Sequence, residues 1–73
     1  MSSANTNSDK VLLEFTLNGH KHTYFKRIDM YGKPVTTNNV NNARKVKKND
    51  VKSIITFLIK EYGKSNITDF NWQ

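Results

Sequence analysis

The chain has 73 residues, a formal net charge of +6 at neutral pH and no cysteine. A chain of this size buries only about 60% of its unfolded surface on folding, so a deep enclosed active site is not expected. A disulfide framework and a cysteine-based zinc site are excluded. No stretch approaches the roughly 18 apolar residues of a membrane span, and the first residues do not resemble a signal peptide. The sequence therefore predicts a cytoplasmic protein with no membrane partner.

The N-terminal residues differ in composition from the rest of the chain. Met1–Ser8 is rich in small polar residues, with no charged side chain and no hydrophobic periodicity. Such a segment cannot bury enough apolar surface to offset the entropy lost on folding. We expect a disordered N-terminal segment over residues 1–9 and one small α+β domain over residues 10–73.

The first element predicted after this segment is a β-hairpin. Asn18-Gly19 stands between two β-prone runs, which is typical of a two-residue hairpin turn. We therefore expect a hairpin over Val11–Ile28. Leu13 should face Tyr24 across such a turn, which puts Tyr24 on the core face and Phe25 on the opposite face.

A second turn and a third strand are expected next. Asp29–Pro34 has the composition of a turn, with Gly32 suited to unusual backbone angles and a proline that cannot donate to a ladder. The third strand should lie somewhere within Val35–Val46. The register stays open because Asn38–Asn42 favours a loop, although asparagine also pairs with adenine in nucleic-acid recognition.

The last third of the chain predicts one amphipathic helix, at about Asp50–Tyr62. Asn49 or Asp50 is a suitable cap, and Gly63 is suited to end the helix. Apolar residues recur at helical spacing: Val51, Ile54, Ile55, Leu58, Ile59 and Tyr62.

This apolar stripe must pack against the apolar face of the hairpin, because no other complementary surface is available. The expected fold is thus α+β, a small antiparallel sheet packed against one helix. The sheet face should consist of Val11, Leu13, Phe15, Leu17, Tyr24 and Ile28. Beyond the helix, Ile67, Phe70 and Trp72 should form either a short C-terminal strand or a tail beside the helix.

The positive charge is segregated along the chain. Charges cancel in residues 1–25 and in residues 53–73, so the whole net charge of +6 lies in residues 26–52. There, Asp29 and Asp50 are opposed by Lys26, Arg27, Lys33, Arg44, Lys45, Lys47, Lys48 and Lys52. Such segregation favours a functional basic surface, and the chemistry that this surface offers is attraction to a phosphate backbone. We expect a small nucleic-acid-binding module, with Phe25 or Tyr31 as candidates for stacking on bases.

The order of three strands and a helix, together with the turn Ile28–Pro34, is similar to the small amino-terminal DNA-binding domains of some phage and transposon integrases. The resemblance covers residues 23–58. It implies a DNA-binding module and carries over no individual residue.

The sequence is also compatible with functions other than nucleic-acid binding. A small phage or mobile-element protein that binds and modulates an acidic host protein would use the same charge, and a homodimer would enlarge a small core. His20 and His22 have the spacing of two metal ligands, but two ligands do not make a site. No nucleophile, base and orienting group come together, so we expect no enzymatic activity, no cofactor and no small-molecule substrate.

Overall fold

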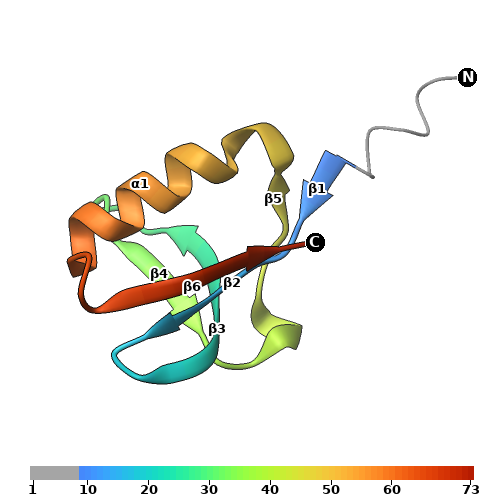
Figure 1. The fold of residues 1–73 in the computed structure, drawn as a ribbon. Coiled ribbons are helices and arrows are strands. Elements are labelled where there is room, and N and C mark those ends of the chain that lie inside the picture. Colours follow the sequence, from blue (N-terminus) through green and yellow to red (C-terminus); the bar gives the residue numbers. More distant parts are fainter. Residues whose placement is uncertain (1–8) are drawn as a thin grey trace, which may run out of the picture.

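Figure 1 shows the computed structural model, which describes residues 9–73. The disordered segment predicted over residues 1–9 lies outside the described residues, apart from Asp9. One helix packs against a small antiparallel sheet, so the expected α+β architecture is confirmed. No helix within residues 9–73 has the length and apolar character needed to cross a membrane.

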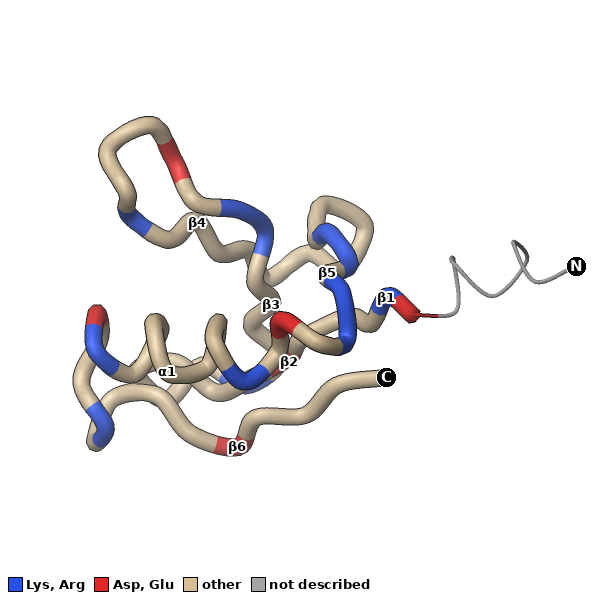
Figure 2. The backbone as a smooth tube through the Cα atoms, turned by 90° about the horizontal axis from the view of Figure 1, so that it is seen from above, with Lys and Arg blue, Asp and Glu red and all other residues tan. Residues whose placement is uncertain are grey.

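The strands form two separate antiparallel sheets. The described residues form β1 (Lys10–Val11), β2 (Leu13–Leu17), β3 (His20–Ile28), β4 (Pro34–Thr37), β5 (Val46–Lys47) and β6 (Ile67–Trp72). The larger sheet has the order β4-β3-β2-β6, whereas β1 pairs only with β5 within the described chain. Strands β3 and β4 form a ribbon that stands apart from the helix when viewed from above (Figure 2).

The third strand predicted within Val35–Val46 is split in two. Strand β4 begins at Pro34, one residue before the predicted range, and a proline is tolerated there because β4 is an edge strand. The short 3-10 helix η2 (Val40–Asn42) follows, with the Asn39 side chain accepting a hydrogen bond from the Asn41 backbone N–H. The chain becomes extended again at Val46, but it pairs with β1.

The hairpin has the predicted turn and a different register. Leu17 faces His20 as expected, but Phe15 faces Thr23 and not His22, because β3 carries an extra residue in a β-bulge. His22 has a positive φ of 61° there. Beyond the bulge the faces of β3 are exchanged, so the predicted places of Tyr24 and Phe25 are wrong.

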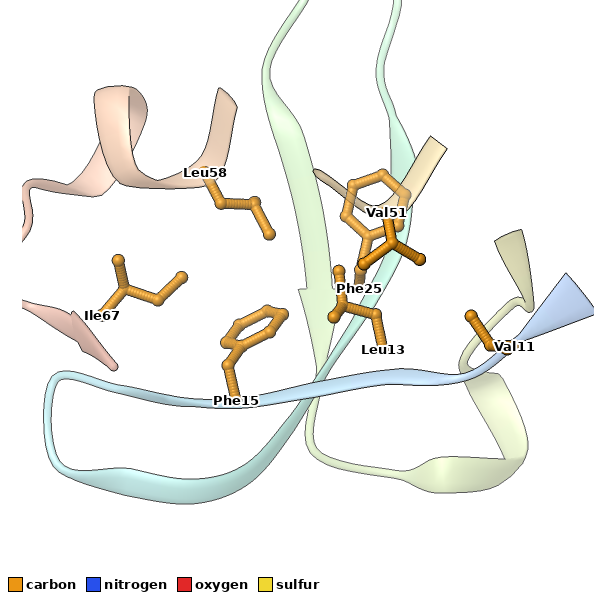
Figure 3. Packing of buried hydrophobic residues seen from close by; sticks show 7 residues of the cluster. All are labelled: Val11, Leu13, Phe15, Phe25, Val51, Leu58 and Ile67. Atoms are coloured by element: carbon orange, nitrogen blue, oxygen red, sulfur yellow. The ribbon is translucent and has the colours of Figure 1, made fainter. Parts of the chain in front are cut away.

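Phe25 consequently belongs to the hydrophobic core, while Tyr24 lies opposite Glu14 on the other face of the sheet. Figure 3 shows the core residues: Val11, Leu13, Phe15, Phe25, Val51, Leu58 and Ile67. Ile28, which was also predicted in the core, is half-exposed. Burial of a large apolar side chain contributes about 1.5–3 kcal/mol, so this cluster accounts for the packing of the helix on the sheet.

Helix α1 (Val51–Tyr62) matches the predicted range to within one residue. It follows directly from the 3-10 helix η3 (Lys48–Asp50), and Gly63 ends it with a positive φ of 95°. Val51 and Leu58 of the predicted stripe are buried, and the other members pack partly buried against the core.

Strand β6 settles the two possibilities left open for the C-terminal residues. It pairs with β2 as the second edge of the larger sheet. Ile67 is buried and the Phe70 ring packs against Phe15, with ring centroids 5.7 Å apart. Trp72 remains partly exposed.

Candidate nucleic-acid interface

The short β1–β5 pair holds two lysines against each other. Val11 is buried and pairs with Val46, which is partly buried and packs against the core. Because side chains alternate along a strand, this anchoring directs the neighbouring Lys10 and Lys47 to the solvent side. They are direct cross-strand partners. Like charges in this position destabilise a strand pair.

A third lysine joins this pair. Lys10, Lys47 and Lys48 line a hollow of about 360 Å³, together with Asp9 and Asn49. Lys48 lies at this hollow because η3 (Lys48–Asp50) starts immediately after β5. The hollow is therefore lined by three lysines and one aspartate, an excess of positive charge suited to an anion.

Two more cations precede β5. Arg44 and Lys45 are exposed in the segment between η2 and β5. We call the resulting surface the basic end, and it consists of Lys10, Arg44, Lys45, Lys47 and Lys48. Figure 2 shows the blue positions gathered around β5 and beside β1. Within residues 9–73, none of the five forms an ion pair.

Four of the predicted cations do not belong to the basic end: Lys26, Arg27, Lys33 and Lys52. Lys26 is the extra residue of a second bulge, between β3 and β4, and Arg27 beside it is exposed. Lys52 is exposed in the first turn of α1. Unlike these three residues, Lys33 forms an ion pair, in which its Nζ lies 3.0 Å from Glu61 Oε1. That carboxylate offsets its charge.

The two predicted stacking residues differ sharply in exposure. Phe25 is only 5% exposed, so its ring offers little surface to a base. Tyr31 is 81% exposed in the turn between β3 and β4. The Asp29 carboxylate orders this turn by accepting from the Tyr31 and Lys33 backbone N–H groups at 2.8 and 2.9 Å.

His22 lies beside Glu14 on the face of the sheet opposite the core, whereas His20 is the exposed cross-strand partner of Leu17. His22 Nδ1 is 2.6 Å from Glu14 Oε2. Partial burial and the neighbouring Glu14 carboxylate raise the pKa of the Tyr24 phenol above its usual range. Residues 9–73 contain no group of three His, Asp or Glu side chains arranged to hold a metal ion.

Lys10 is the one member of the basic end that sequence reasoning missed. Asp9 balances it locally, so it counts as part of a neutral terminus. Its pairing with Lys47 depends on the long-range register of β1 and β5. No sequence pattern indicates that register, because each strand has only two residues.

Comparisons with models of protein families, with curated proteins and with solved structures return no match to this chain.

Proposed function

We propose that this chain is a cytoplasmic, non-enzymatic module that binds nucleic acid through the basic end. The observation that carries the proposal is the direct pairing of Lys10 with Lys47, with Lys48 on the same hollow. Three ammonium groups held together repel one another and cost folding free energy. A phosphate backbone would relieve that repulsion and release its condensed counterions on binding.

The residue types favour contacts with phosphates over reading of base edges in a duplex. Four of the five cations in the basic end are lysines, which act as point charges without the bidentate geometry of arginine. Arg44 is the single guanidinium group among them. Affinity should therefore depend steeply on salt and weakly on duplex sequence.

Charge reversal of Lys47 and Lys48 to Glu tests this proposal. The matched control is the reversal of Lys60 and Lys64 to Glu, two exposed lysines beyond the basic end that change the net charge equally. Fluorescence anisotropy would measure the affinity for single-stranded DNA, single-stranded RNA and duplex DNA at two salt concentrations. We expect binding that weakens with salt and is lost in the Lys47/Lys48 variant. Equal losses in both variants, or no binding at low salt, would refute the proposal.

A protein partner with an acidic surface is the second candidate, as for a small phage or mobile-element protein that modulates a host protein. The observation that favours it is the apolar tip of the β3–β4 ribbon, where Met30 is 87% exposed beside Tyr31. Exposed apolar side chains of this size are typical of protein contacts. A Met30→Ser/Tyr31→Ser variant should then lose its partner in a pull-down. Light scattering would show whether the partner is a second copy.

A further inference from the structure

A groove of about 540 Å³ lies between β3 and α1. Phe25 and Ile28 line it from β3, and Ile54 and Phe57 line it from α1. Ile28 is 49% exposed, although it stands beside the core. Mostly apolar clefts of this size, with a few polar groups, are typical ligand sites. We call this site the apolar groove, and its full lining is Phe25, Arg27, Ile28, Asp50, Ser53, Ile54 and Phe57.

An ion pair bridges the ribbon and the helix beyond one end of the groove, and η3 lies at the other. Lys33 in the turn of the ribbon is paired with Glu61, one helical turn beyond Phe57, so this ion pair ties the ribbon to the helix. At the opposite end, Asp50 lines the groove as the last residue of η3, which starts with Lys48 of the basic end. The groove and the basic end are therefore adjacent along the chain at η3.

The walls suit a flat aromatic group. Phe57 is partly buried against the core, which leaves part of its ring for a ligand. Phe25 belongs to the same core cluster as Val51, the first residue of α1 (Figure 3), and its almost complete burial makes that side of the groove rigid. A rigid apolar site loses little conformational entropy when a ring enters it.

The polar groups point to a charged ligand. Arg27 lines the groove, and Lys26 and Lys52 adjoin its lining residues in the chain. These three cations outnumber Asp50, the one acidic residue of the lining, so the surroundings of the groove carry a net positive charge. A flat aromatic group attached to a phosphate satisfies both the apolar walls and the surrounding positive charge.

We infer that the apolar groove takes an unpaired base of a single-stranded nucleic acid whose backbone runs over the basic end. This inference rests on the proposed function and adds to it a preference for single strands. In a duplex the bases are stacked inside the helix, so none is available to enter the groove.

Phe57→Leu is the variant that tests this site, because leucine keeps an apolar side chain and removes the stacking ring. Phe70→Leu is the matched control, since Phe70 is a partly buried ring that packs on Phe15 away from the groove. The full chain would be titrated into a labelled single strand of about 12 deoxycytidines, and into a duplex of equal length. Thermal unfolding of both variants would check that each is folded.

Removal of the ring should weaken single-strand binding about 5-fold or more, as expected for loss of base stacking, and should leave duplex binding unchanged. Phe70→Leu should bind like the natural chain. Unchanged single-strand affinity in Phe57→Leu, or an equal affinity of the natural chain for the duplex, would overturn the groove inference. If Lys47→Glu/Lys48→Glu still abolished binding in that case, the proposed function would stand without the groove. Binding of an acidic apolar peptide at the groove, with no binding of the single strand, would overturn both.

Discussion

Lys10 and Lys47 face each other directly across the β1–β5 pair, although they are far apart in the sequence. Each is exposed, and each neighbours a valine that packs inward. The pairing of the valines thus holds the two ammonium groups together against their repulsion. The β1–β5 pair is therefore less stable than it would be with opposite charges at these two positions.

Lys47→Glu should make the protein more stable and a weaker binder. It replaces a like-charge pair with an opposite-charge pair, which is expected to add about 0.5 kcal/mol to the free energy of unfolding at low salt. The same change places a carboxylate where a phosphate is proposed to bind. Urea unfolding and anisotropy would measure the two effects. Lys60→Glu is the control and should show neither, so a Lys47→Glu protein that is less stable or binds equally well contradicts this account.

Lys33→Ala should leave nucleic-acid affinity within about twofold of the natural value. The charge of Lys33 is already offset by Glu61, and removal of a surface ion pair costs only about 0–1 kcal/mol of stability. By contrast, Lys45→Ala should lower the slope of log affinity against log salt by about 0.7–0.9, the value of one phosphate contact. Titrations at several salt concentrations would compare them. Equal effects of the two variants would show that the basic surface extends to the turn of the ribbon.

Thr23→Val should destabilise the fold by about 1–3 kcal/mol. The buried Thr23 hydroxyl donates to the His20 carbonyl at 2.9 Å and accepts from Asn38 Nδ2 at 2.9 Å, so valine leaves both partners unpaired. Urea unfolding would measure the loss. The control is Thr56→Val on the exposed side of α1, where the hydroxyl bonds only the Lys52 carbonyl. Thr23 directly follows the β-bulge of β3. A similar cost at both positions would show that its hydrogen bonds contribute no more than that of an exposed hydroxyl.

Asp50 should give the groove a preference for cytosine over thymine in a single strand, and Asp50→Ala should remove that preference. Asp50 stands at the N-cap of α1 but makes no side-chain capping bond, so its carboxylate is available to accept from an exocyclic amino group. Loss of this negative charge should also raise the affinity for every polyanion. The diagnostic quantity is therefore the ratio of the affinities for oligo-dC and oligo-dT. A ratio that is the same in the natural chain and the variant would contradict the role given to Asp50.

Much of the fold could be predicted because it depends on local chemistry. Asn18-Gly19 specifies a hairpin turn, and the apolar spacing from Val51 to Tyr62 specifies a helix that Gly63 ends. These rules act over a few residues and hold in almost any context. The basic segment was also predictable, since the order of charges along the chain is read directly from the sequence.

The bulge at His22 could not be predicted in this way. Positive φ is uncommon outside glycine, and although asparagine, aspartate and histidine adopt it more often than other residues, a histidine in a β-prone run does not by itself indicate a bulge. The Thr23 hydroxyl bonds the His20 carbonyl within β3, but its second hydrogen bond, from Asn38, forms only when the chain after β4 has come back against β3. One extra residue then exchanged the faces of Tyr24 and Phe25.

The sequence by itself determined the hairpin, the helix and the segregation of charge, since each follows from neighbouring residues. Only the tertiary structure decided that Phe25 is buried, that Ile28 and Phe57 line a groove and that Lys10 joins the basic end. These features depend on which residues meet across strands far apart in the chain. That register is set by the packing of the whole core and not by the propensities of any one segment.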